Sequence, residues 1–283
     1  MTPVAGEADV AVVIVNFRTA ELTLEAVRSV TPEPGVAEIV VVDNDSGDGS
    51  ADVLRSGLAE EPRARLVESA SNLGFGRGLN LGIGQCTSPL LLLLNSDATL
   101  VTGSLEPLRR ALLTDASIGI VAPAVYTGDG EELQAGAHGV FPTLAAVARR
   151  TNHHPPETLW PDWVSGVAML LRRADFEAVG GFDPDFEMYL EDVDLCRRMR
   201  AAGKRVRREM GAAVVHLGGR SWRTYEAQSD QAQRSRVLYY RKAGYAGQAR
   251  MVVGAIRLTH LALARVRRRR PAAGGQPGGQ ARA

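Results

Sequence analysis

Cysteine is nearly absent from this 283-residue chain, which holds only Cys86 and Cys196. Two cysteines cannot form a disulfide framework, so we expect reduced thiols and a cytoplasmic protein. Long apolar runs are also absent. Residues 89–94 are too few to cross a bilayer, and Arg257 and His260 interrupt the apolar segment 251–264. The first ten residues carry acids and no basic group, which argues against a secretory signal peptide.

Familiar nucleotide-binding fingerprints are missing as well. The turn after the first apolar run, residues 16–19, has no glycine. The glycines at 74, 76 and 78 are followed by Leu79 where G-x-G-x-x-G requires its last glycine. No lysine precedes Lys204, so a Walker A lysine and the lysine-rich amino-terminal loop of nucleotidyltransferases are both lacking. These absences argue against NAD-binding, P-loop and nucleotidyltransferase functions.

Charge is distributed unevenly, although the formal net charge is only +1. The chain up to Asp230 carries a net charge of −11, whereas residues 231–283 hold twelve basic residues and no acid. An acidic body argues against a nucleic-acid partner, and a basic end favours contact with an anionic surface. We expect an amphipathic helix over 249–270 in peripheral contact with the inner face of the cell membrane. The alternatives are a solvated tail and a helix packed on the domain.

Apolar runs alternate with helical patterns along the first half of the chain. Strands are predicted over residues 10–15, 38–43, 65–68, 89–94, 118–122, 164–171 and 212–216. Helices are predicted over 21–30, 74–84, 191–202, 225–243 and 246–270, and a further short helix is predicted to end near Gly57. Loops and short hairpin pieces are predicted over 126–160. The alternation predicts an α/β fold with a mostly parallel central sheet flanked by helices on both faces.

Polar residues follow the apolar runs, where parallel sheets bind ligands. Asn16 and Asp43 end two runs, and Asp43 is either an acceptor for a nucleoside or an ordinary turn former. The glycines of segment 72–80 open a helix and either admit an anion or form a plain turn. Arg77 within that segment either reaches a diphosphate or is solvated. Asp97, after five leucines, either binds a hard cation together with a diphosphate or lies in a surface turn.

Acids also open the helix predicted over 191–202. Asp192 lies three residues before Leu195 and should share its apolar face, whereas Glu191 and Asp194 should lie on the other side. Asp192 is therefore the acid expected to point inward as a general base, unless these acids only complement the helix dipole. His216 ends the run AAVVH and is either structural or, beside Asp97, a ligand.

The order of the motifs is more specific than any single one. VAVVIVNF, EIVVVDNDSGDGS, NLGFGRGLN, LLLLNSD, WVSGVAMLLRR, GGFDPDF, YLEDVDLCRR and VVHLGG follow one another over residues 8–225. The series resembles the inverting family-2 glycosyltransferases with the GT-A fold, in particular their rhamnosyltransferase-like branch. The resemblance implies a GT-A domain over 8–225. The helical patterns and basic charge that follow predict a helical basic appendage over 226–270. The low-complexity segment 271–283 is expected to be disordered.

The resemblance also implies roles for particular residues. Asp192 would be the catalytic base, and Asp97 and His216 the metal ligands. Residues implied to border the nucleotide-sugar are Val15, Asn16, Phe17, Asp43, Asn72, Gly74, Arg77, Asn80, Asn95, Ser96 and Asp97, and those implied on the acceptor side are Trp163, Ser165, Gly166 and Glu191. The chain departs from the family at Asn95, where the D-x-D element has its first acid. It also departs at Leu79, where many relatives carry Arg or Asn.

The implied activity is transfer of a sugar to a hydroxyl of a glycan or of a polyprenyl-diphosphate-linked glycan, in bacterial cell-wall or surface polysaccharide synthesis. The implied donor is dTDP-rhamnose first and otherwise a UDP-sugar, with Mg²⁺ or Mn²⁺ as cofactor. The rival hypothesis is a GT-A module that binds a nucleotide-sugar or glycan without transfer. The joint presence of Asp97, Asp192 and His216 favours the enzyme.

Overall fold

The computed structural model describes residues 9–143, 155–218, 225–245, 247 and 251. The strands are β1 (Val10–Asn16), β2 (Val36–Asp43), β3 (Ala64–Glu68), β4 (Leu90–Asn95), β5 (Ala98–Leu100), β6 (Ile118–Thr127), β7 (His138–Gly139), β8 (Trp163–Val164), β9 (Ala168–Arg172) and β10 (Arg205–His216). The helices are α1 (Ala20–Val30), α2 (Ser50–Gly57), α3 (Phe75–Ile83), α4 (Leu105–Thr114), α6 (Arg173–Ala178), α7 (Glu191–Ala201) and α8 (Tyr225–Lys242).

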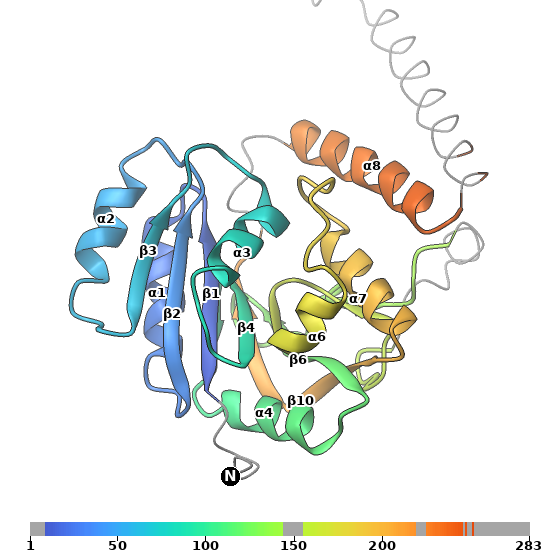
Figure 1. Ribbon diagram of the computed structural model, residues 1–283, viewed down its shortest axis with the longest axis horizontal. Helices are drawn as coiled ribbons and strands as arrows, with labels where there is room; N and C mark the ends of the chain where they lie inside the picture. Colours follow the sequence, from blue (N-terminus) through green and yellow to red (C-terminus); the bar gives the residue numbers. More distant parts are fainter. Residues whose placement is uncertain (1–8, 144–154, 219–224, 246, 248–250, 252–283) are drawn as a thin grey trace, which may run out of the picture.

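One large sheet runs through the molecule in the order β3-β2-β1-β4-β9-β6-β10-β5. Strands β1 to β4 pair in parallel, as do β6 and β10. Strand β9 is antiparallel to β4 and β6, and β5 is antiparallel to β10. Figure 1 shows helices on both faces of this sheet. The expected α/β fold with a mostly parallel, helix-flanked sheet is therefore confirmed.

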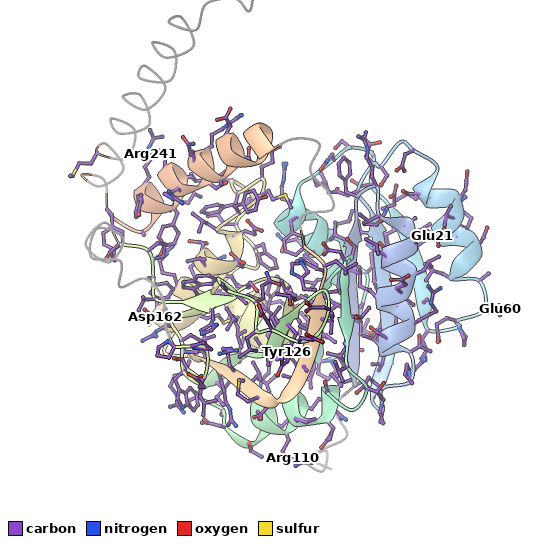
Figure 2. All side chains as sticks on the ribbon, turned by 180° about the vertical axis from the view of Figure 1, so that it is seen from behind. Glu21, Glu60, Arg110, Tyr126, Asp162 and Arg241 are labelled. Carbon is purple, nitrogen blue, oxygen red and sulfur yellow. The ribbon has the colours of Figure 1, made fainter. Side chains whose placement is uncertain are left out.

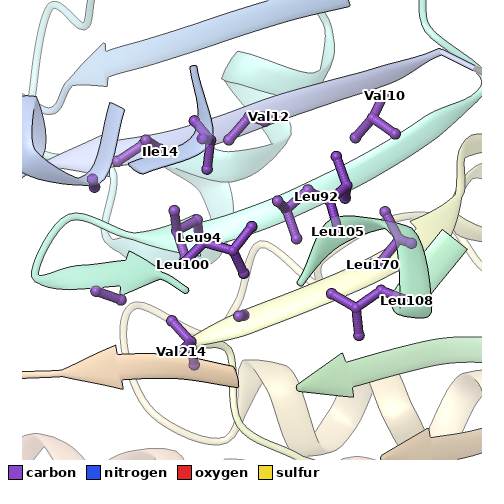
Figure 3. Packing of buried hydrophobic residues seen from close by; sticks show 14 of the residues in the cluster. Val10, Val12, Ile14, Leu92, Leu94, Leu100, Leu105, Leu108, Leu170 and Val214 are labelled. Carbon is purple, nitrogen blue, oxygen red and sulfur yellow. The ribbon is translucent and has the colours of Figure 1, made fainter. Parts of the chain in front are cut away.

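Alternate residues of β1 serve two separate cores. Val10, Val12 and Ile14 pack in the core that α1, α2 and α4 cover, part of which is shown in Figure 3. Ala11 and Val13 pack in the opposite core, which α3, α6 and α7 cover. Because both faces of the strand are buried, every position must be apolar, which is why this run shows no alternation.

The predicted strand over 164–171 is in fact two strands, β8 and β9, separated by Ser165, Gly166 and Val167. The break matters because it places the backbone of these three residues at the edge of the sheet. Strand β10 begins at Arg205, seven residues before the predicted start, since its first half carries arginines that hide the strand pattern. The short strand β5 and the helices α4 and α6 were not predicted.

Helix α8 packs on α7 and on the loop that precedes α7. Tyr239 and Tyr240 are each 1% exposed and form a cluster with Phe186 and Val193. The expected domain boundary at 225/226 stays a prediction, and the helix that follows it is joined to the domain by buried side chains. The tail over 271–283, and all of the basic helix over 249–270 except Met251, lie outside the described residues. Among the helices that the structure describes, none combines the length and the apolarity of a membrane span.

Candidate active site

Asn16 and Asp43 lie side by side at the carboxyl ends of β1 and β2. Both are buried, and Nδ2 of Asn16 donates to Oδ1 of Asp43 at 2.7 Å. The hydroxyl of Ser46 donates to the same oxygen at 2.6 Å, and Thr23 donates to Oδ1 of Asn16 at 2.9 Å. Asn16 therefore ties the two loops together. Oδ2 of Asp43 has a weaker partner, the Ser46 backbone N–H at 3.4 Å, and is the better placed oxygen for a ligand.

Arg18 belongs to this corner, although no sequence pattern marks it. Its backbone is left-handed, with φ of 61°, and its Nε donates to the carbonyl of Ser46 at 2.9 Å. The guanidinium carbon lies 4.9 Å from the ring centroid of Phe17, next to Val15 and Asn16. A non-glycine residue in this backbone region is strained, and such strain tends to occur at functional sites. An exposed cation and an aromatic ring therefore meet where the nucleotide is expected.

The glycine-rich segment 72–80 is fixed by contacts on both sides. Asn44 donates to Oδ1 of Asn72 at 3.1 Å and accepts from the backbone N–H of Leu73 at 2.9 Å. Gly74 has φ of +79°, and a Cβ at this position would lie 2.1 Å from the carbonyl oxygen of Glu187. Glycine is therefore required where the helix α3 begins.

Asn80 and Arg77 make local contacts of a different kind from those expected. The Asn80 side chain donates to the carbonyl of Phe182 at 2.8 Å and accepts from its N–H at 3.0 Å. Nε of Arg77 donates to the carbonyl of Leu73 at 2.6 Å. Asn80 thus pins the GGFDPDF turn against α3. Contact of either residue with the donor stays a prediction.

Asp97 and His216 lie together because β5 runs antiparallel to β10 and sets Ala98 opposite His216. Oδ1 of Asp97 is 3.1 Å from Nε2 of His216, and Nδ2 of Asn95 is 3.4 Å from the same nitrogen. Oδ1 of Asn95 is buried without a hydrogen-bond partner. Ser96 accepts a hydrogen bond from Thr19 at 3.0 Å and so joins this group to the loop after β1.

Gln134 completes this group and was not predicted, because a lone amide in a loop carries no sequence pattern. Its Oε1 lies 2.8 Å from Nδ1 of His216, so that a proton on Nδ1 leaves the lone pair of Nε2 facing Asp97. Metal-binding histidines are commonly oriented in this way. No third His, Cys, Asp or Glu side chain joins a metal-holding group anywhere in the described part of the chain. A carboxylate and an imidazole nitrogen fit a divalent cation whose remaining ligands come from a substrate.

Asp192 is held next to the break between β8 and β9. Its Oδ2 accepts from the N–H of Gly166 at 2.9 Å, and its Oδ1 accepts from the N–H of Val193 at 2.8 Å. The next residue, Val167, accepts from the N–H of Asn95 at 2.9 Å. Because Asn95 is two residues from Asp97, this chain of hydrogen bonds brings the two distant carboxylates to the same edge of the sheet.

The other residues expected on the acceptor side lie around Asp192. A Cβ on Gly166 would lie 2.9 Å from the Phe75 ring, so this glycine allows the loop to approach α3. The hydroxyl of Ser165 is buried without a hydrogen-bond partner. The indole N–H of Trp163 donates to the carbonyl of Val140 at 2.9 Å and is thus committed to the fold.

The expectation that Asp192 points inward while Glu191 and Asp194 lie on the other side of the helix is wrong for the latter two acids. Glu191 is 4% exposed and Asp194 is fully buried, whereas Asp192 is half-buried. Asp194 tolerates burial because Arg197 and Arg198 each bind it at 2.7 Å. The helical spacing misjudged these positions because α7 is covered from more than one side. Helix α3 faces Glu191, where a Cβ on Gly76 would lie 3.5 Å from the Glu191 Cβ, and α8 packs on Val193.

Glu191 and Asp192 differ in what stabilises their charge. Burial raises the pKa of Glu191 to about 8, with the neighbouring Asp192 charge as a second cause, and its Oε2 is buried without a partner. Burial also raises the pKa of Asp192, but the N–H groups of Gly166 and Val193 oppose this rise. Asp192 is therefore the acid that ionises first, and Glu191 keeps its proton at neutral pH.

The turn that delivers these two acids is strained. Tyr189 and Leu190, directly before Glu191, have φ of 70° and 67°. Left-handed backbone costs a non-glycine residue about 1–2 kcal/mol. Two such residues in succession mark a conformation that surrounding contacts must impose.

The mostly parallel sheet, whose carboxyl edge gathers these groups from β1, β2, β4 and the entry to β9, has the arrangement of the GT-A fold. Two solved structures share this fold. The mannosyltransferase PcManGT from Pyrobaculum calidifontis, in complex with GDP-Man and Mn²⁺, matches with a TM-score of 0.61 and 20% identity over 84% of this chain and 64% of its own. The S. aureus TarS 1–349 structure in complex with UDP matches with a TM-score of 0.56 and 13% identity, over 82% of this chain and 72% of its own.

The sequence family is equally clear. The profile described as Glycosyl transferase family 2 matches residues 11–180, and the chain belongs to this family of glycosyltransferases. N-acetylglucosaminyl-diphospho-decaprenol L-rhamnosyltransferase of Mycobacterium tuberculosis is 28% identical over 58% of this chain. Pre-mycofactocin glycosyltransferase of the same species is 30% identical over 78%. The aligned regions span 61% and 43% of these two relatives.

Proposed function

We propose that the chain is an inverting glycosyltransferase that uses a nucleotide diphosphate-sugar and has Asp192 as its catalytic base. One observation carries this proposal. The Asp192 carboxylate is fixed by Gly166 at the loop that is hydrogen-bonded to Asn95, so it shares an edge of the sheet with the Asp97–His216 pair. A base with a raised pKa and a charge-stabilising group thus flank one place for a sugar.

In the proposed reaction, Asp192 accepts the proton of an acceptor hydroxyl. The acceptor oxygen attacks the anomeric carbon from the side opposite the nucleotide and forms the new glycosidic bond. The bond from that carbon to the diphosphate oxygen breaks, and the nucleoside diphosphate leaves with the electron pair. Attack from the opposite side inverts the configuration of the sugar.

Asp97 and His216 are the residues proposed to hold Mg²⁺ or Mn²⁺. The cation would offset the negative charge that develops on the leaving diphosphate. The Mn²⁺ in the complex of the mannosyltransferase neighbour supports this assignment. Asp43 and Phe17, with Arg18, are proposed to face the nucleoside.

We propose rhamnose as the sugar, with dTDP-rhamnose as donor and a UDP-sugar as the rival. The acceptor is proposed to be a glycan on a polyprenyl diphosphate, in the synthesis of cell-wall or surface polysaccharide. Both proposals are supported by the rhamnosyltransferase relative, whose name contains a diphospho-decaprenol acceptor. A screen of sugar nucleotides with Mn²⁺ tests the donor, because a ligand that binds only the native state raises the melting temperature.

Replacing Asp192 tests the base. Asp192→Asn should lower turnover by about 10²–10⁴-fold, because it removes the proton acceptor, and should leave the donor affinity nearly unchanged in calorimetry. Glu177→Gln, an exposed acid on α6, is the matched control and should behave as wild type. Wild-type turnover in Asp192→Asn refutes the assignment. Donor binding by wild type without transfer or donor hydrolysis supports the non-catalytic module instead.

A further inference from the structure

We infer that helix α8 is a positioning element of the catalytic centre, in which Ser235 and Lys242 hold the loop 183–190 in the conformation that aims Glu191 and Asp192. The inference rests on the proposed role of Asp192. It concerns residues that lie outside the region 11–180 matched by the family profile. It also gives α8 a task beyond that of a surface appendage.

The loop needs external support because its last two residues are strained. Tyr189 and Leu190 both adopt left-handed backbone, and the carbonyl of Leu190 accepts the N–H of Asp194 as α7 begins. If these two residues relaxed to ordinary backbone angles, the first turn of α7 would rotate. The Asp192 carboxylate would then leave the N–H of Gly166.

Helix α8 contacts both ends of this loop. The Ser235 hydroxyl donates to the carbonyl of Met188 at 2.5 Å, one residue before the strained pair. Nζ of Lys242 lies 2.6 Å from carboxylate oxygens of both Asp183 and Asp185. The polar contacts of α8 therefore fasten the loop where it starts and where its backbone becomes strained.

The opposite side of the loop is fixed by the donor-side helix. The N–H of Phe75 donates to the carbonyl of Glu187 at 3.1 Å, and Asn80 binds the backbone of Phe182. The loop is thus clamped between α3, which the glycine-rich segment opens, and α8. The strained turn lies between two fixed supports, which is the arrangement that keeps such a turn from relaxing.

Apolar burial makes the support on the α8 side rigid. Tyr239 and Tyr240 pack with Phe186 of the loop, which is fully buried, and with Val193 of α7. Ser235 is itself 2% exposed, so its hydroxyl is shielded from competing water. Arg236 and Arg241 of the same helix are exposed, and Figure 2 labels Arg241 on α8. These arginines supply matched controls.

The experiment compares the purified full-length chain with Ser235→Ala and with Ser235→Thr, which keeps the hydroxyl. Ser235→Ala should lower kcat on the order of ten- to a hundredfold, because misplacing a catalytic group costs rate. The donor KM and calorimetric Kd should stay within about twofold of wild type, since α8 supports the base rather than the nucleotide corner. Ser235→Thr should restore most of kcat, and Arg236→Ala should match wild type.

Lys242→Ala, with Arg241→Ala as its control, repeats the test at the other end of the loop and decides the matter if Ser235→Ala does not fold. Unchanged kcat in folded Ser235→Ala or Lys242→Ala, while Asp192→Asn is inactive, overturns the inference and leaves the proposed function intact. Wild-type turnover in Asp192→Asn removes the proposed function itself. Equal losses in kcat and donor affinity that Thr does not rescue show a merely structural role and also overturn the inference.

Discussion

At the scale of single residues, Glu191 and Asp192 are buried neighbours that differ in the hydrogen bonds available to their charged forms. Glu191 has a pKa of about 8 in the folded protein, against an ordinary value of 4.5. Between these two values the folded chain keeps a proton that the unfolded chain has lost. The free energy of unfolding should therefore fall as pH rises from about 5 to 8. The direction is opposite to that of a carboxylate stabilised by an ion pair.

Glu191→Gln isolates this contribution because the amide does not titrate. Its free energy of unfolding, measured by urea denaturation from pH 5 to pH 8, should change less steeply with pH than that of wild type. The control Glu177→Gln alters an exposed acid and should keep the wild-type slope. If the free energy of unfolding changed equally with pH in wild type and Glu191→Gln, the pKa of Glu191 would be the same in the folded and the unfolded chain.

Gln134 acts on the proposed metal site through His216. Gln134→Ala should weaken Mn²⁺ binding by about 10–100-fold, measured by calorimetry with saturating nucleoside diphosphate, because the ring loses the partner that orients it. Gln134→Glu keeps an acceptor oxygen beside Nδ1 and should restore most of the affinity. Asp97→Ala, which removes a proposed ligand, sets the scale of full loss. Wild-type Mn²⁺ affinity in Gln134→Ala would contradict the assignment.

At the scale of elements, Gly74 joins two structures that lie far apart in sequence. Gly74→Ala would bring Cβ against the carbonyl of Glu187 and also strain a left-handed backbone. Gly103→Ala is the matched control, since Gly103 has φ of +83° with open space around its missing Cβ. We expect Gly103→Ala to cost about 1–2 kcal/mol in unfolding free energy, and Gly74→Ala clearly more. Activity should fall only in Gly74→Ala. Similar losses of unfolding free energy and of activity in both variants would show that backbone strain alone matters, and not the contact with Glu187.

Sequence reasoning predicts the elements better than it predicts their direction. Strands β1, β2 and β4 are continuous apolar runs and were placed correctly within one or two residues. The antiparallel course of β9 was not predicted, because its apolar residues read the same in either direction. Strand β5 is only three residues long, too short to show a period.

The residues of the candidate site were also predictable only in part. Asn16, Asp43 and Asp97 were predictable because each follows an apolar run at the expected edge of the sheet. Gln134 and Ser235 were not, since a lone amide in a loop and a hydroxyl in a helix carry no pattern. Their roles depend on which distant backbone or ring the fold brings within hydrogen-bond distance.

At the scale of the whole molecule, the uneven charge predicts where the chain gathers in a cell. The proposed basic helix over 249–270 should bind anionic vesicles with about 1 kcal/mol for each basic residue near the surface. In flotation with anionic liposomes, the full chain should therefore partition more than the 1–248 truncation. The difference should shrink at high salt because ions screen the attraction. Equal partitioning of the two chains would rule out membrane contact through this segment.

Strand β9 has one further consequence. Because it runs against β4 and β6, residues that precede it, rather than those that follow it, reach the edge where Asp192 is held. The segment that connects β6 to β9 can therefore change in length without altering how β1, β2 and β4 pair. We therefore expect the proposed acceptor preference to diverge between Gln134 and Trp163 of this connection, while the pairing of β1, β2 and β4 stays the same.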